Sequence, residues 1–288
     1  MASLKEVKGR IASVNNTRKI TSAMKMVASA KLHKAQAAIE SMLPYERRLH
    51  HILTDFMSNC TEVTSPFIVK REVKRVAVVV FASNTSLCGG FNANVIRHLV
   101  DLLAEYKPLG LENILVFPVG KKVADAVRKL GFRIEGDFQH MADKPSYQEA
   151  ADLATDLMKR FLHGDVDKVE LLYNHFKSIA SQILTRETYL PIDLNNEKKE
   201  EKKKTIDYIL EPSAEELMQD MLPKVLRMKM FTVLLDSNAA EHAARTMAMQ
   251  IATDNANELL QELTVMYNKS RQQAITNELL DIVGGSMA

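Results

Sequence analysis

The sequence predicts an α/β protein in which two long terminal helices pair as a coiled coil and a compact α/β unit is inserted between them. Apolar residues recur with helical spacing from Leu4 to about Met57, and again from Ser213 to about Val283. Short β-branched runs alternate with helical patterns in between, which is typical of βαβ units. Single helices rarely exceed about 25 residues without support, so the two long helices must pack against each other or against a partner.

The first helix opens with the alternating steps of three and four residues that define a coiled coil, at Leu4, Val7, Ile11 and Val14. Its unbroken length would be about 80 Å. The stripe is expected to resume after Arg18 through Ile20, Met24 and Val27, and then, shifted, through Ala28, Leu32, Ala35, Ile39 and Met42. Pro44 predicts a kink or step in this helix.

After a linker at 58–71, the middle of the chain predicts a mainly parallel sheet with right-handed crossovers. The expected strands are 73–83, 112–120, 132–138, 168–176 and 182–192, and the expected helices are 92–106, 121–131 and 146–162. The last two strands have no helix between them, so we expect a hairpin at one edge.

The second long helix should begin at Ser213, because Glu216 three residues later completes a capping box. Its expected apolar face is Leu217, Met221, Val225, Met228, Phe231 and Leu235, followed by alanines and then by Leu259, Leu263, Met266, Leu279, Ile282 and Val283. Pro223 predicts a kink, and Gly284 with Gly285 should end the helix. The charged stretch 193–207 is expected to be a surface loop.

Composition bounds the function. The 288 residues are 46% hydrophobic, carry a net charge of +2 and can form one good core. Residues 1–35 are mostly basic and the last 35 mostly acidic, which favours pairing of the two helices. Cys60 and Cys88 have no metal-site spacing, which favours free thiols. We expect neither a signal peptide nor a membrane-spanning helix.

Two motifs leave alternatives open. The loop SNTSLCGGFN occupies the position where a Rossmann unit binds phosphate, but it lacks GxGxxG spacing, so Gly89 and Gly90 favour a simple turn over a nucleotide site. The basic first helix could bind nucleic acid or an acidic protein surface, and its alanine and serine content favours the protein. Scattered histidines and methionines predict neither catalytic, cofactor-binding nor metal-binding residues.

Four sequence blocks carry a family resemblance across essentially the whole chain: IASVNNTRKITSAMKMVASAKLHKAQ, SLCGGFN, AARTMAMQIATDNA and YNKSRQQAITNELLDIVGG. They resemble the gamma subunits of bacterial rotary F-type ATP synthases. The tail matches the form I-T-x-E-hydrophobic-x-E-I-V-x-G, with Asp281 in place of the second Glu. The loop departs from S-D-R-G-L-C-G at Asn84, Thr85 and Ser86.

The resemblance implies an α/β fold with a long antiparallel coiled coil of the terminal helices and an inserted Rossmann-like domain. The expected parts are the helix 1–57, the α/β domain 72–192, the charged loop 193–212 and the helix 213–285. It implies a non-catalytic central-stalk rotor that couples ion transport, through a membrane ring, to ATP synthesis or hydrolysis in a hexamer of alpha and beta subunits. The epsilon subunit and the ring of c subunits are further implied partners, and nucleic acid is not one.

The resemblance also implies which residues do this work. Contacts with the catalytic subunits are expected from Arg271, Gln272, Thr276, Lys8, Arg10, Arg18 and Met24. An apolar bearing at the tip is expected from Leu279, Leu280, Ile282 and Val283, and a contact with the membrane ring from Glu211. The expected location is peripheral, on the cytoplasmic face of a bacterial inner membrane. A Rossmann-like nucleotide enzyme and a basic nucleic-acid-binding coiled coil are the rival hypotheses.

Overall fold

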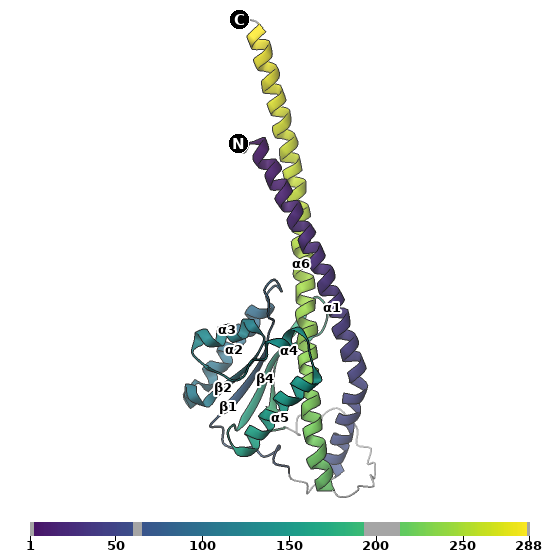
Figure 1. Ribbon diagram of the computed structural model, residues 1–288, viewed down its shortest axis with the longest axis vertical. Coiled ribbons are helices and arrows are strands. Elements are labelled where there is room, and N and C mark those ends of the chain that lie inside the picture. Colours follow the sequence, from purple (N-terminus) through teal and green to yellow (C-terminus); the bar gives the residue numbers. More distant parts are fainter. Residues whose placement is uncertain (1–2, 60–64, 193–213, 287–288) are drawn as a thin grey trace.

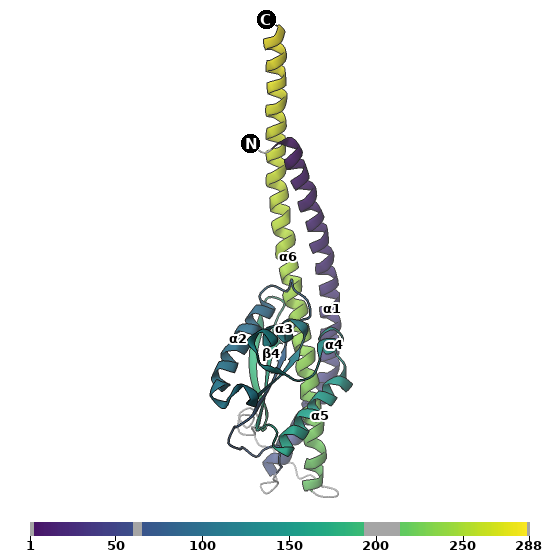
Figure 2. The same ribbon diagram turned by 60° about the vertical axis from the view of Figure 1, so that its left-hand side comes forward.

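The computed structural model describes residues 3–59, 65–192 and 214–286, and it shows two long antiparallel helices with a five-stranded α/β unit beside their lower half (Figures 1 and 2). Helix α1 is Leu4–Asn59 and helix α6 is Ala214–Ser286. At 73 residues, α6 is about 110 Å long. The expected fold class, a coiled coil of the terminal helices with an inserted Rossmann-like domain, is confirmed.

The sheet has the order β3-β2-β1-β4-β5. Its strands are β1 Val76–Phe81, β2 Ile114–Val119, β3 Arg133–Ile134, β4 Lys168–Phe176 and β5 Gln182–Leu190. The first four are parallel, and β5 pairs antiparallel with β4 as the expected edge hairpin. The third strand is much shorter than expected, because the chain turns at Gly136 (φ +76°) where Phe138 closes over the backbone.

The helices of the unit are α2 Phe91–Tyr106, α3 Lys121–Leu130, α4 Gln139–Asp143 and α5 Tyr147–His163, with 3₁₀ turns at Lys107–Leu109 and Leu111–Asn113. Helix α4 and the 3₁₀ turns have no clear periodicity in the sequence and were not expected. Gly131 and Gly164 end α3 and α5 in left-handed conformations, with φ +77° and +78°.

Alternate residues of β1 face two separate cores. Val76, Val78 and Val80 pack under α2 and α3, whereas Ala77, Val79 and Phe81 face α4, α5 and α6. Helix α6 therefore covers part of the sheet, and residues such as Leu222, Leu226 and Met230 belong to the same core as the strands. The α/β unit and the long helix share one apolar core.

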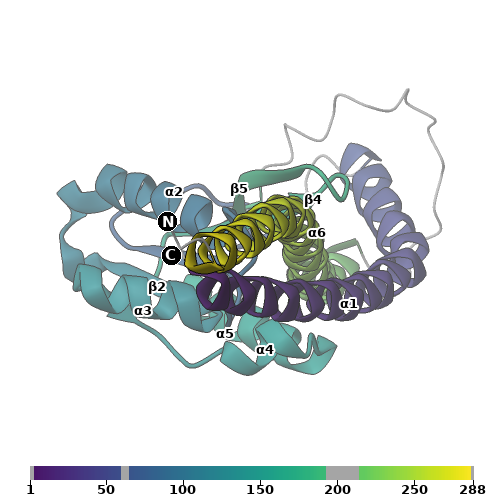
Figure 3. The same cartoon turned by 90° about the horizontal axis from the view of Figure 1, so that it is seen from above.

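Because α6 shares a core with the α/β unit, the buried face of its first turns differs from the face that the sequence predicts. Met218, Leu222, Leu226 and Met230 are the deeply buried series, whereas Leu217, Met221 and Val225 are only half-buried. From Met230 to Thr246 almost every residue is buried or half-buried. A helix buried on all sides needs partners on opposite faces, which are here α1 and the α/β unit (Figure 3).

The expected stripe on α1 is wrong at two positions. Ile20 and Val27 point outward, with exposed fractions of 60% and 59%, and the buried residue next to Ile20 is Thr21. The expected Ala28, Leu32 and Ala35 are buried. The helix is continuous through Arg18 and Pro44. Alanine and threonine form the interface here because they let the two helices approach closely, which an Ile and Val stripe would prevent.

Two expected ends differ or lie outside the described residues. Helix α6 continues through Gly284 and Gly285 to Ser286. Glycine ends a helix only when its φ turns left-handed, as at Gly131 and Gly164. The helix also continues through Pro223. Ser213, Glu211 and the charged stretch 193–212 lie outside the described residues.

Candidate functional site

The upper part of α6 extends beyond the beginning of α1 (Figure 1). Thr21 on α1 lies beside Thr253 on α6, and counting this antiparallel register outward puts Leu4 beside about Ser270. Val7 and Leu263 are still buried in the interface between the two helices. We call α1 and residues 214–270 of α6 the shaft, and residues 271–286 of α6 the projecting end.

The projecting end has no covering element, and nearly all of its described side chains are exposed. Leu279, Leu280, Ile282 and Val283 have exposed fractions of 57%, 64%, 67% and 52%. Arg271, Gln272 and Thr276 are exposed on the same segment, and the Thr276 hydroxyl donates to the Gln272 carbonyl at 2.9 Å. The sequence-predicted residues of this helix therefore lie together on one free end.

The predicted residues of α1 lie lower and divide into two environments. Lys8 and Arg10 are exposed, and Arg10 donates to Glu6 one turn earlier at 2.8 Å. Arg18 and Met24 are half-buried on the part of α1 that overlaps α6. The Arg18 guanidinium donates to Asn15 Oδ1 at 3.0 Å and to Asn257 Oδ1 of α6 at 3.3 Å. Two donors of this arginine are therefore engaged within the chain.

The expected charge pairing of the two helices is not what joins them near the top. Among the described side chains of 4–28 and 246–270, the polar contacts across the interface are the hydrogen bonds between Arg18 and Asn257 and between Thr21 and Thr253. Glu278 and Asp281 lie on the projecting end, which extends beyond the beginning of α1 (Figure 1).

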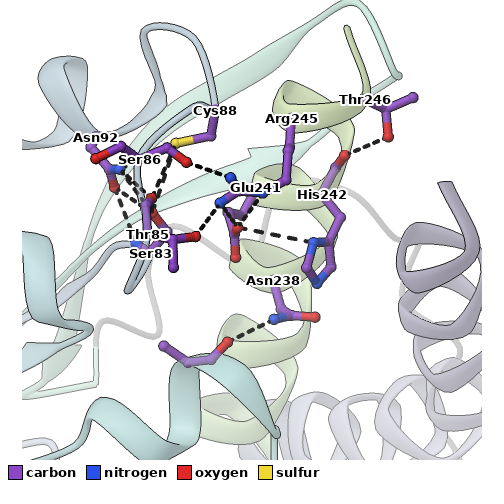
Figure 4. Close-up of polar contacts among 11 residues, drawn as sticks. Ser83, Thr85, Ser86, Cys88, Asn92, Asn238, Glu241, His242, Arg245 and Thr246 are labelled. Atoms are coloured by element: carbon purple, nitrogen blue, oxygen red, sulfur yellow. Dashed lines mark hydrogen bonds and ion pairs between the residues drawn. The ribbon is translucent and has the colours of Figure 1, made fainter. Parts of the chain in front are cut away.

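A polar junction fixes the loop after β1 to α6 (Figure 4). Arg245 donates to the Ser86 carbonyl and, at 2.9 Å, to Thr85 Oγ1, while Glu241 one turn earlier pairs with the same guanidinium. Asn84 bridges two other elements, because its amide donates to the Gln139 carbonyl and accepts from the Lys121 N–H, both at 2.8 Å. The three residues that depart from the family pattern thus all make contacts within the chain.

Further contacts tie other parts of the α/β unit to the same helix. The carboxylate of Asp236 accepts from the Phe176 N–H at 2.8 Å and pairs with His175 Nδ1 at 2.6 Å. Asn238 donates to the Ala142 carbonyl at 2.9 Å (Figure 4). Tyr189, fully buried, donates to the Leu226 carbonyl at 2.8 Å. The α/β unit is therefore held to α6 by directional bonds as well as by the shared core.

The position of a Rossmann phosphate site is covered by α6. Gly90 precedes α2 as its N-cap without a side-chain cap, and Gly89 (φ +59°) makes the turn. A cavity of about 210 Å³ remains between this turn, the 179–182 hairpin turn and the α6 residues Ala244, Met247, Ala248 and Ile251. The interpretation of the glycines as a turn fits this geometry, since the long helix occupies part of the space that a nucleotide would need.

His242 is buried in the shaft beside the junction, with an exposed fraction of 7% and no hydrogen-bond partner at Nδ1. Burial lowers the pKa of its imidazole, and the nearby cations Lys31 and Arg245 lower it further, against the opposing effects of Glu241 and Asp143. The neutral ring is therefore the form that fits the folded chain.

We expect this histidine to make the chain less stable in mild acid. Because the folded pKa lies below the unfolded value of about 6.5, stability is full above that value and falls as the pH drops below it. Urea unfolding at pH 5.5 and 7.5 should show a smaller loss in His242→Gln than in the native chain. His98→Gln, at an exposed site, is the control and should lose as much as the native chain. Equal losses in all three chains would contradict the prediction.

No helix in the described ranges is long and apolar enough to cross a membrane, and no three His, Cys, Asp or Glu side chains gather there in a metal-binding arrangement.

Comparisons with known proteins match the chain over its full length. A family model described as ATP synthase matches residues 3–288. ATP synthase gamma chains from Phocaeicola vulgatus and Bacteroides fragilis are 82% and 65% identical, each covering 100% of both chains. A solved mitochondrial ATP synthase of Euglena gracilis contains a chain with the same fold, at a TM-score of 0.63 and 21% identity, covering 99% of this chain and 93% of that one. A chain in the central stalk/c-ring structure from Tetrahymena thermophila gives a TM-score of 0.57 at 22% identity, covering 81% of this chain and 99% of that one.

Proposed function

Since the chain belongs to the gamma-chain family of the ATP synthases, and is therefore the non-catalytic central-stalk rotor subunit of such a complex, we propose that its projecting end and the top of α1 are the surfaces that act on the catalytic head. The observation that carries this proposal is the continuous helix α6, buried in the α/β unit below and exposed above. One rigid element thus connects the two ends of the molecule.

Coupling by such a rotor requires that rotation of the α/β unit at the lower end of the molecule be transmitted to the projecting end of α6. The α/β unit cannot turn independently of α6, because they share a core and because Asp236, Asn238 and Arg245 make directional bonds between them. A torque applied to the unit is therefore transmitted to the helix. An asymmetric tip that stabilises a different conformation of each catalytic site in turn would then couple rotation to catalysis.

We assign the partners from the similar structures and the contacts from the chemistry of the exposed side chains. The similar structures from Tetrahymena thermophila and Euglena gracilis comprise a central stalk with a c-ring, and F1 with a c-ring, and we propose the corresponding alpha and beta head and membrane ring for this chain. Arg271, Gln272 and Thr276 offer directional hydrogen bonds to loops of the head, and Lys8 and Arg10 offer charge to acidic groups there. Met24 would add an apolar contact. Arg18 would offer charge as well, with two of its donors already bound to Asn15 and Asn257.

The four apolar residues of the projecting end suit a bearing. Leu279, Leu280, Ile282 and Val283 would turn inside an apolar sleeve, where contacts without direction offer no fixed stopping point. We further propose that the foot of the molecule contacts an epsilon subunit, that Glu211 lies near the ring, and that the complex sits peripherally on the cytoplasmic face of a bacterial membrane.

The test of the head contact is Gln272→Leu in the assembled complex. Loss of the side-chain amide removes hydrogen bonds that we place at the catalytic loops, so coupled ATP synthesis in membrane vesicles should fall about tenfold while the complex still assembles. Gln273→Leu is the matched control, because it makes the same change on another face of the helix. Unchanged synthesis in Gln272→Leu, or an equal fall in both variants, would overturn the assignment.

A further inference from the structure

The cavity of about 210 Å³ beside α6 lies at the switch point of the sheet. Strands β2 and β3 follow β1 on one side, with α2 and α3 on one face, and the chain then returns through α5 on the other face to place β4 on the opposite side of β1. Open α/β sheets bind their ligands at the carboxyl ends of the two strands where this reversal occurs. Both ends reach the cavity here, through Cys88 in the loop after β1 and Asn174 near the end of β4.

Asn174 has a side-chain donor without a partner. The residue is only 4% exposed, and its Nδ2 makes no hydrogen bond. It lies on the same face of the sheet as Leu172, which packs in the core under α2. A buried donor left unpaired lowers stability, and native folds seldom keep one without a reason. A ligand that brings an acceptor to Asn174 in the cavity would remove this cost.

Gln182 offers the opposite kind of group from the turn between β4 and β5. Its Nε2 donates to the carbonyls of Ser178 at 3.3 Å and Ile179 at 3.0 Å. These bonds hold the amide nitrogen on the turn, so Oε1 is the atom that Gln182 can offer to a ligand, as an acceptor. Since Gln182 and Asn174 both line the cavity, a matching ligand carries an acceptor and a donor, as amides and nucleobases do.

The remaining walls are apolar and uncharged. Ile179, Met247 and Ile251 border the cavity with exposed fractions of 49%, 40% and 50%, and Ala244 and Ala248 leave space beside them on α6. The described residues that line the cavity include no Asp, Glu, Lys or Arg, so a phosphate would find no cation there. Because a protein cavity of about 150 Å³ can hold benzene, this one has room for a single substituted ring.

We propose that this cavity binds an uncharged planar heterocycle with an amide-like edge, of the kind found in nicotinamide and in pyrimidine bases. Asn174 Nδ2 donates to the carbonyl of the ligand, Gln182 Oε1 accepts from its N–H, and the faces of the ring rest on Met247 and Ile251. The loop with Cys88 lies against α6 (Figure 4), so the ligand would contact the α/β unit and the long helix together. This site is separate from the surfaces proposed to act on the catalytic head.

Equilibrium dialysis of the full chain against nicotinamide or uracil tests the proposal. One of the two rings should bind saturably with millimolar or tighter affinity, and inorganic phosphate should not bind. The side-chain amide resonance of Asn174 in a ¹H–¹⁵N spectrum should shift along the same binding curve, because its Nδ2 gains an acceptor.

Asn174→Leu separates a ligand contact from a structural role. It removes both polar atoms at similar volume, so binding should weaken about tenfold while the chain becomes no less stable to urea. A structural role would lower the stability instead. Asn16→Leu, at an exposed position of α1, is the matched control and should keep the native affinity. If Asn174→Leu does not fold, Gln182→Met removes the acceptor at a half-buried position and should weaken binding in the same way.

Ala248→Leu tests the position of the ligand. The larger side chain extends into the cavity and should abolish binding, whereas Ala93→Leu, an exposed change on α2 outside the cavity, should leave it unaltered. The proposal fails if neither ring binds saturably or if phosphate binds in their place. It also fails if the affinity is unchanged in Ala248→Leu, or in Asn174→Leu or the Gln182→Met variant that stands in for it.

Discussion

Phe161→Ala should lower the free energy of unfolding by about 3–5 kcal/mol. The ring lies fully buried in the core between α5 and the sheet, and the guanidinium of Arg71 stacks 4.5 Å from its centroid. Removing the ring leaves a cavity in the core that the sheet shares with α6, and also removes the surface on which the guanidinium rests. Urea unfolding of the full chain, followed by circular dichroism, measures the loss.

The neighbouring Leu162→Ala provides the control for this substitution. Leu162 is 46% exposed on the same helix, so its truncation should cost less than about 1 kcal/mol. Equal losses in the two variants would mean that the effect comes from helix propensity rather than from the core.

Glu170→Ala should cost about 2–3 kcal/mol. The carboxylate is only 2% exposed, and it accepts from Arg186 Nε at 3.0 Å and pairs with Lys168 Nζ at 2.6 Å. Its removal leaves two cations close together without their shared acid. Both cations are partly exposed and regain some water, which keeps the cost below that of a fully buried pair. The same urea unfolding measurement checks the value.

Glu105→Ala separates burial from pairing. Glu105 pairs with the same guanidinium at 2.7 Å but is 57% exposed, so its loss should cost less than about 1 kcal/mol. If Glu105→Ala cost as much as Glu170→Ala, burial would not be the source of the effect.

Glu170 also predicts a dependence on pH. Burial by itself raises the pKa of this carboxyl, but hydrogen bonds from Lys168 and Arg186 outweigh it and hold the pKa below its usual value. The stabilisation is therefore complete above the ordinary pKa near 4.5 and is lost as the pH falls through the lower folded value. The difference in stability between the native chain and Glu170→Gln should shrink over that range.

Periodicity predicted the long helices and the strands well, because continuous apolar patterns over many residues are hard to produce by chance. It failed for short elements such as α4 and for the length of β3, where a turn at Gly136 decides the outcome. It also chose wrong residues at two positions of α1. Ile20 and Val27 are apolar but exposed, and the buried residue next to Ile20 is Thr21, whereas the predicted Ala28 is buried.

For the candidate site, too, the sequence predicted some features and missed others. The resemblance pointed to Arg271, Gln272 and Thr276, and the structure places all three together on an exposed segment. Nothing in the sequence showed that α6 extends beyond α1, or that Arg18 is held by Asn257. Thr253 and Arg245 were missed because a single threonine or arginine on a helix carries no periodic signal.

The sequence by itself determined the family, the two long helices and the inserted α/β unit. Only the tertiary structure decided which side of each helix is buried, how far the helices overlap and where the α/β unit joins α6. The physical reason is that periodicity reports the preferences of one helix alone. Overlap and two-sided burial depend on close packing of small residues and on polar contacts such as that of Thr21 with Thr253, which exist only when two distant segments meet.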